Sequence, residues 1–176
     1  MSMAVSAEPV PALAIRPETP QDGPLVDALI ARAFGPGRFT KVSERVREFA
    51  TFAPELSAVA WAPDDKTGDR ILGCARMWRV RVGGQPVMFL GPFAVEQGER
   101  NAGFGQRLIQ RACEMARAAG ETHVLLVGDE PYFGRVGFSG AMAREVVMPG
   151  PVDHRRVLAR GLILDAEPLA GLVTAA

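Results

Sequence analysis

The chain has 176 residues, 48% of them apolar and 23% charged, a size and composition typical of one globular domain with a single hydrophobic core. Its 20 basic residues balance its 20 acidic ones, so no surplus of positive charge predicts binding to nucleic acid or to an anionic membrane. Its two cysteines and two histidines lack metal-binding spacings, which favours buried thiols in a reducing compartment and no structural metal.

The N-terminal residues 1–11 are rich in Ala, Pro and Ser, and we expect them to form a flexible tail ahead of one domain over residues 12–176. They lack the basic start and the continuous apolar stretch of a secretory signal. No apolar run in the chain approaches the ~20 residues of a membrane span. We therefore expect a cytoplasmic protein that does not enter the membrane.

The domain is expected to begin with a short strand, Ala12–Arg16, which Pro17 closes. A helix follows from about Thr19 to Phe34, because Thr19 and the next residues form a typical helix start. The breaker sequence Gly35-Pro36-Gly37 ends this helix. A second, charged helix is expected at Val42–Phe49.

Strands dominate the middle of the chain. They are expected at Leu56–Ala62, Arg70–Val82 and Val87–Val95, and Gly83-Gly84 forms a hairpin turn between the last two. The third strand is almost entirely apolar, which indicates burial on both faces. Pro92 removes a backbone donor from it, so we expect the strand to be irregular there.

A long amphipathic helix is expected at about Gly103–Ala119, followed by a short apolar strand, His123–Val127, that pairs parallel to the preceding strand. A short turn or helix is expected at Glu130–Arg135 and another strand near Ala143–Met148. The pattern of Arg156–Leu164 fits either a strand or a short helix.

The stretch Arg100–Gly105, between a strand and a helix, is the most informative for function. Glycines at a helix start let a ligand approach the backbone and leave amide N–H groups free, so the helix end forms an anion site suited to a pyrophosphate. A dinucleotide fingerprint would need Gly or Ala where Leu108 stands, and a Walker loop would need Gly-Lys-Ser/Thr. A glycine turn without any ligand is the remaining alternative.

The wider sequence resembles the GNAT superfamily of acetyl-CoA-dependent N-acyltransferases. The family signature, Gln/Arg-x-x-Gly-x-Gly/Ala after a central strand, is matched by Arg100, Gly103 and Gly105. The resemblance covers about residues 12–165 and is strongest to a bacterial branch, the YhbS-like group. Further similar segments are Ile15–Thr19, Leu90–Val95, Val127–Asp129, Tyr132–Phe138 and Pro149–Asp153.

This resemblance implies an α+β fold, a three-layer αβα sandwich. Its central sheet would be mixed but mostly antiparallel, with six to seven strands and about four flanking helices. The family's fourth and fifth strands splay apart, and the pantetheine arm of the cofactor lies between them. The diphosphate would rest on backbone N–H groups at the helix start. The residues implied in binding acetyl-CoA are Phe93, Ala94, Val95, Arg100, Asn101, Ala102, Gly103, Phe104, Gly105 and Gln106.

The resemblance also implies direct attack of a primary amine on the acetyl group in a ternary complex. The usual general acid is a tyrosine four residues before the Gly-Phe pair, but that position is Phe133, and its neighbour Tyr132 is the possible acid. Many relatives have Gly-Arg where Asn101 and Ala102 stand, so a cationic contact to the cofactor is missing here.

The general base stays unassigned. Glu96 follows the apolar strand, Glu44 and Glu48 fit a solvated helix face, and His123 fits a hydrogen-bonded core position. The acceptor is a small-molecule or protein amine, and the protein is expected to be a monomer or homodimer. The alternatives are transfer of a longer acyl group and a non-catalytic acyl-CoA-binding or regulatory module.

Overall fold

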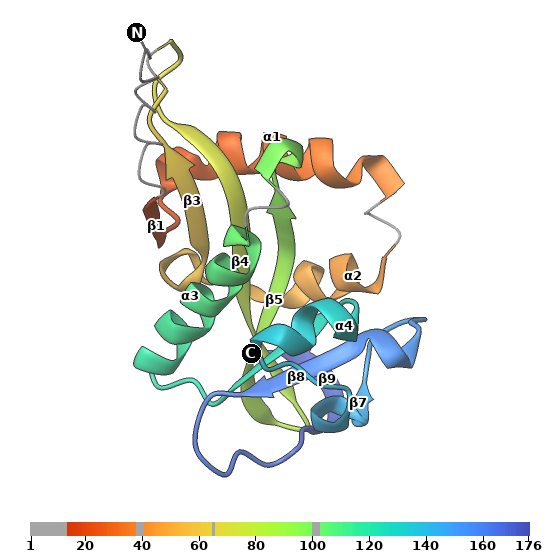
Figure 1. Cartoon of the computed structure of the whole chain (residues 1–176). Coiled ribbons are helices and arrows are strands. Elements are labelled where there is room, and N and C mark those ends of the chain that lie inside the picture. The colour runs from red at the N-terminus through yellow and green to blue at the C-terminus, as the bar shows by residue number, and fades with distance from the viewer. Residues whose placement is uncertain (1–13, 38–40, 65, 100–102) are drawn as a thin grey trace, which may run out of the picture.

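A nine-stranded mixed sheet forms the centre of the fold, with α-helices on both of its faces (Figure 1). The computed structural model describes residues 14–37, 41–64, 66–99 and 103–176. The predicted α+β class and its layered arrangement are confirmed. The α-helices of the described residues are α1 (Gly23–Phe34), α2 (Val42–Phe49), α3 (Phe104–Ala118) and α4 (Glu130–Phe133).

The sheet has one continuous path of strands and a smaller extension. The path runs in the order β1 (Ala14–Pro17), β3 (Ala58–Ala62), β4 (Arg70–Val82), β5 (Gln85–Val95), β6 (His123–Val127) and β8 (Val157–Gly161). The remaining strands are β2 (Thr51–Phe52), β7 (Glu145–Val147) and β9 (Ala170–Ala175). Strand β9 joins the end of β4 to β7. The β5–β6 and β7–β9 pairs are parallel, and the other strand pairs of the described chain are antiparallel.

The strand count is higher than the six to seven that we expected. The undecided segment Arg156–Leu164 contains β8, because its backbone pairs with β6 over five residues. Strands β2 and β9 were not predicted, since one has two residues and the other consists mostly of small residues. The expected strand Leu56–Ala62 starts late, at Ala58, because Pro54–Leu56 form a 3-10 turn.

Helices α1 and α3 cover opposite faces of the sheet and bury its central strands. On one face, Leu29 and Ile30 of α1 pack in a cluster with Cys74 of β4. On the other face, Phe104 and Leu108 of α3 belong to the largest core cluster. Both helices pack on β4, which fixes the start of α3 relative to β5.

Strands β5 and β6 separate halfway along their length. In the described chain their parallel pairing covers Met88 with Val124 and Phe89 with Leu125 and extends no further. Strand β5 nevertheless continues to Val95 as a partner of β4. The β4–β5 register shifts beside Pro92, which confirms the predicted irregularity of this strand. Strands β5 and β6 correspond to the family's fourth and fifth strands. The gap between them is therefore the splay that the resemblance implied.

The buried histidine and the two cysteines have the surroundings that the sequence predicts. His123 is 3% exposed, and its ring nitrogens lie 2.7 Å from the Glu167 carbonyl oxygen and 2.9 Å from the Thr122 hydroxyl, so it is a hydrogen-bonded core histidine. Cys74 and Cys113 are free and buried. Among the helices of the described ranges, none has both the length and the apolar character that crossing a membrane requires.

Candidate active site

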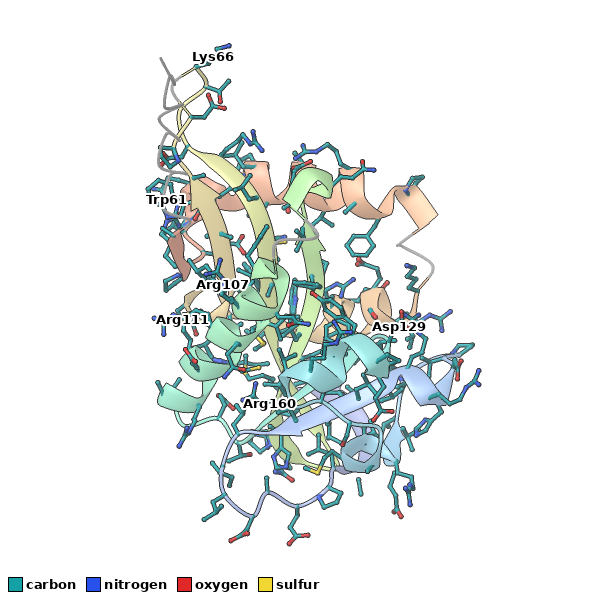
Figure 2. The ribbon with its side chains drawn as sticks, in the orientation of Figure 1. Trp61, Lys66, Arg107, Arg111, Asp129 and Arg160 are labelled. Carbon is teal, nitrogen blue, oxygen red and sulfur yellow. The ribbon has the colours of Figure 1, made fainter. Side chains whose placement is uncertain are left out.

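The splay opens into a cleft of about 590 Å³. Its floor is the irregular part of β5, and one wall is the end of β6 with α4. The start of α2 and the loop over residues 151–153 close the other sides. Figure 2 shows Asp129, the residue before α4, on the side of the molecule where this cleft lies.

The first turn of α3 approaches β5 and α4 closely at Gly105. A Cβ atom on Gly105 would lie 2.7 Å from the Tyr132 hydroxyl oxygen, 3.1 Å from Cζ of Phe93 and 3.3 Å from a methyl carbon of Val95. Real Cβ atoms are essentially never found as close as the first of these distances, so glycine is needed here for the present arrangement. Four of the predicted site residues therefore meet at one place.

Gly103 precedes the first turn of α3 and has a φ of +70°, a conformation that favours glycine. Helix α3 begins directly after it, and Gly105 in its first turn lies against Phe93 and Val95 of β5. The first N–H groups of α3 have no partner within the helix, and the positive end of the helix dipole favours an anion. The helix start thus has the properties of a diphosphate site.

The other predicted cofactor residues take different places. Ala94 faces away, into the cluster beneath α1, so only its backbone can serve a ligand in the gap. The Phe104 side chain is buried against Gly73 and contributes to the core. Arg100, Asn101 and Ala102 lie outside the described residues.

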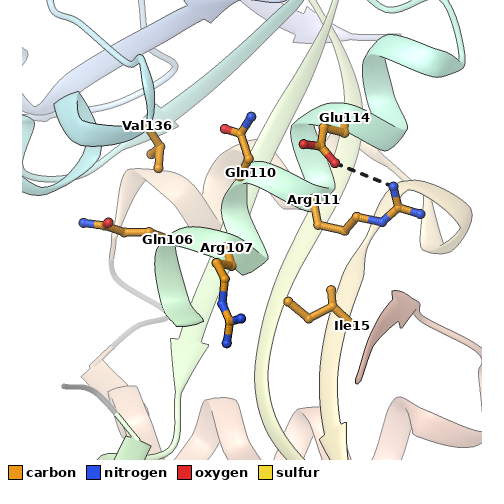
Figure 3. A pocket seen from close by; sticks show the side chains of 7 residues that line it. All are labelled: Ile15, Gln106, Arg107, Gln110, Arg111, Glu114 and Val136. Atoms are coloured by element: carbon orange, nitrogen blue, oxygen red, sulfur yellow. Dashed lines mark ion pairs between the residues drawn. The ribbon is translucent and has the colours of Figure 1, made fainter. Parts of the chain in front are cut away.

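Gln106 faces a second, shallower groove along α3. Figure 3 shows this groove, about 400 Å³ in volume, with Gln106 and Val136 on one side and Arg111 on the other. Arg111 lies 3.7 Å from Glu114 within the same helix. The groove is separate from the cleft, since the two share no lining residue among those described.

Three aromatic rings form the wall of the cleft next to α4. The ring centroid of Phe93 lies 6.1 Å from that of Tyr132 and 6.0 Å from that of Phe133. Phe133 packs so closely over Gly128 that a Cβ there would overlap its ring. The two neighbouring rings of α4 thus point to different places, Phe133 to the end of β6 and Tyr132 to the start of α3.

The Tyr132 hydroxyl is a proton donor in a partly desolvated position. Burial raises its phenolic pKa above the ordinary value of 10, and the nearby positive charge of Arg135 opposes this shift. Among the described residues, none forms a hydrogen bond with this hydroxyl. The phenol is therefore protonated at neutral pH and free to donate to a group in the gap.

The candidate bases are in unlike surroundings. Glu96 pairs with Arg32 of α1 at 2.9 Å, and Glu48 is exposed. Glu44 pairs with Arg47 at 2.6 Å, and Arg47 lines the cleft. Of these three carboxylates, Glu44 is the one held directly beside the cleft.

Sequence reasoning missed two groups of charged residues that line the cleft. Arg47 was not singled out among the charges of α2, although its side chain is only 10% exposed and lines the cleft. Arg156 pairs with Asp129 at 3.1 Å although 27 residues separate them. Glu44 and Arg47 stand three residues apart, the spacing of side chains on one helix face, and this was a local signal for the first group. No local signal pointed to the second.

Comparison with known proteins identifies the family to which this fold belongs. Residues 25–138 match the model of the acetyltransferase (GNAT) family. The uncharacterised N-acetyltransferase YhbS of Escherichia coli K12 is 29% identical over 126 residues, which cover 70% of this chain and 72% of the relative.

Two solved structures are similar over almost the whole chain. The crystal structure of E. coli YhbS in complex with CoA has a TM-score of 0.75 and 27% identity, and the match covers 95% of this chain and 91% of that one. A GNAT acetyltransferase of Brucella melitensis in complex with acetyl-CoA has a TM-score of 0.65 and 23% identity, covering 94% and 96%. The chain therefore belongs to the acetyltransferase (GNAT) family.

Proposed function

We propose that this protein is an acetyl-CoA-dependent N-acetyltransferase that moves the acetyl group to a primary amine by direct attack in a ternary complex. The observation that carries the proposal is the meeting of Phe93, Val95, Gly105 and Tyr132 where β5 and β6 separate. Three groups lie side by side there: a strand edge with free backbone groups, a helix start that favours anions, and a protonated phenol. These are the groups that binding a thioester cosubstrate and releasing a thiolate require.

Acetyl-CoA would be held mainly by backbone groups. The edge of β5 at Phe93, Ala94 and Val95 would bind the amides of the pantetheine arm. The amides of Gly103, Phe104, Gly105 and Gln106, with the preceding residues Arg100, Asn101 and Ala102, would bind the diphosphate. The two solved relatives are in complex with CoA and with acetyl-CoA, respectively, which supports this cosubstrate.

In the proposed reaction, the neutral amine nitrogen forms a bond to the carbonyl carbon of the acetyl group, and the carbon–sulfur bond breaks. A backbone N–H near Val95 would stabilise the charge on the carbonyl oxygen. Tyr132 would donate its proton to the departing thiolate. The proton of the amine would leave through a base that stays unassigned.

One observation favours a second candidate, a non-catalytic acyl-CoA-binding module. Phe133, which cannot donate a proton, occupies the usual tyrosine position and packs against Gly128. Transfer of a longer acyl group is a further alternative. We also propose that residues 12–176 form one domain behind a flexible tail, and that the protein is cytoplasmic and works as a monomer or homodimer.

The test is release of free thiol from acetyl-CoA by the purified protein across a panel of amines, with CoA binding measured in parallel by calorimetry. Amine-dependent thiol release supports the transferase. Binding of CoA with no turnover on any amine favours the non-catalytic module, and a chain that does not bind CoA contradicts both. Butyryl-CoA in place of acetyl-CoA tests the acyl-chain length.

A further inference from the structure

Arg47 of α2 places a nearly buried guanidinium in the cleft beside the irregular part of β5. Its side chain is 10% exposed, and its Nη1 lies 3.2 Å from where Gly91 would carry a Cβ. Its Nη2 donates to Glu44 Oε1 at 2.6 Å. No other residue of the described chain accepts a hydrogen bond from Arg47, which lines the cleft, so its Nε and Nη1 have no acceptor among these residues.

Among the side chains that line the cleft, cations outnumber carboxylates, and Glu44, the partner of Arg47, lies just outside this lining. Three cations line the cleft, Lys41, Arg47 and Arg156, against two carboxylates. Both oxygens of one of these carboxylates, Asp153, accept from Arg155, and the other, Asp129, pairs with Arg156. Lys41 has no carboxylate partner among the described residues and lies over the ring of Phe34 at 5.4 Å.

The rest of the cleft wall is largely apolar. Leu90, Pro92, Leu126, Val127 and Val152 contribute to it together with the rings of Phe93 and Phe133. Beside these apolar side chains, a bound molecule meets an arginine that is paired with Glu44 through Nη2 and has further N–H groups with no acceptor among the described residues. An arginine in such a place binds a carboxylate strongly, because its planar N–H groups match the two oxygens and little water competes.

We infer that the acceptor of this transferase is an amine that carries a carboxylate next to the amino group, with an apolar side chain, and that Arg47 binds this carboxylate. The inference rests on the proposed acetyl transfer. Gly91 is two residues from Phe93 on the same strand, so the anion site adjoins the aromatic wall that holds Tyr132. An α-amino acid has its nitrogen and its carboxylate on one carbon atom and fits two such adjacent sites.

The experiment compares matched amines that differ only by the carboxylate, leucine with 3-methylbutylamine and phenylalanine with 2-phenylethylamine. Thiol release is measured at saturating acetyl-CoA, and kcat/KM is expressed per concentration of neutral amine, since the two members differ in amine pKa. The wild-type protein should prefer the amino acid by about 10- to 100-fold, the range expected for a hydrogen bond to a charged group. Arg47→Met should remove this preference, and Arg47→Lys should keep part of it.

Arg45→Met is the matched control, because Arg45 is exposed on the same helix and does not line the cleft. It should leave the preference unchanged. Equal kcat/KM for both members of each pair in the wild-type protein would overturn the inference. So would an Arg47→Met variant that slows both members equally, since Arg47 would then serve the reaction and not the carboxylate.

A binding measurement keeps the two proposals apart. Calorimetric titration of leucine and of 3-methylbutylamine into the CoA complex reports the carboxylate site without any turnover. If no amine is acetylated but leucine still binds the complex at least tenfold more tightly, the transferase proposal fails and the carboxylate site stands. If amines are acetylated with no preference and leucine binds no better, the carboxylate site fails. If Arg47→Met does not fold, the inference is decided by the preference for the amino acid over its matched amine, measured in the wild-type protein and in Lys41→Met.

Discussion

The hydroxyl oxygen of Tyr132 lies 2.7 Å from the position that a Cβ atom on Gly105 would occupy, so the tip of α4's tyrosine rests against the first turn of α3. A methyl group at residue 105 cannot fit without moving that ring, and the ring of Phe93 limits the movement. Gly105→Ala should therefore weaken CoA binding roughly tenfold or more, although alanine favours the helix itself by about 1 kcal/mol. Calorimetric CoA titration with a thermal unfolding scan separates the two effects.

The same contact predicts a partial rescue. Removing the hydroxyl in a Gly105→Ala, Tyr132→Phe double variant should recover part of the lost CoA affinity, because the closest clash is gone. Gly23→Ala is the control, since Gly23 starts α1 with nothing within 4 Å of its Cβ position. Equal CoA affinities in the Gly105→Ala single variant and the wild-type protein would refute the close approach.

Tyr132→Phe tests the proposed general acid. It should lower kcat about tenfold or more while CoA affinity changes little, because the ring keeps its packing and only the proton donor is lost. A general acid acts while protonated, and burial raises the pKa of Tyr132 above 10. Deprotonation of Tyr132 should therefore not lower the wild-type kcat until the pH exceeds 10. A variant that keeps full turnover across the pH range excludes the role.

The two cysteines should resist thiol reagents in the folded protein. Burial raises the pKa of Cys74 to about 12 and that of Cys113 to about 11, so neither forms the reactive thiolate at pH 8. An aromatic disulfide reagent should label both thiols quickly in denaturant and neither in native buffer. Rapid stoichiometric labelling of the native protein would show that one of the two sites opens to solvent.

Local sequence patterns were sufficient to predict most of the helices and strands. The helix Val42–Phe49 and the strands Arg70–Val82 and His123–Val127 have the predicted bounds, because each is set by a breaker or by a clear hydrophobic period. The irregularity at Pro92 followed from its missing N–H group. These features depend on a few adjacent residues, so one sequence is enough to find them.

The site depended on contacts that no local pattern contains. Strand β9 forms because Val173 pairs with Val82, which is 91 positions earlier in the chain. The direction of Tyr132 follows from its contact with Gly105, and the burial of Arg47 from its place beside Gly91. A resemblance to a family gave the expected roles of these positions, but the neighbours of each side chain became visible only in three dimensions.

Asp22 anchors the start of α1 to β1, and its ionisation should be visible in the stability of the fold. Arg16 donates to its carboxylate at 2.6 and 2.9 Å, and the backbone N–H of Thr19 donates at 2.8 Å. The hydrogen bonds from Arg16 lower the pKa of Asp22 from 3.8 to about 2, although burial opposes the shift. A lowered folded-state pKa contributes stability that is present above pH 4 and lost as the pH falls through 2.

Asp22→Asn should therefore reduce the free energy of unfolding at pH 7 by about 1–3 kcal/mol, since it removes a charged partner from a buried position. The difference in free energy of unfolding between variant and wild type should shrink as the pH falls from 4 toward 2, because the wild-type carboxylate also becomes neutral there. Urea unfolding at pH 7, 5, 4 and 3 measures this. Glu114→Gln is the control, because Glu114 is an exposed partner of Arg111 and its loss should change stability little at any of these values. A constant difference at every pH would mean that packing, and not the charge of Asp22, anchors α1.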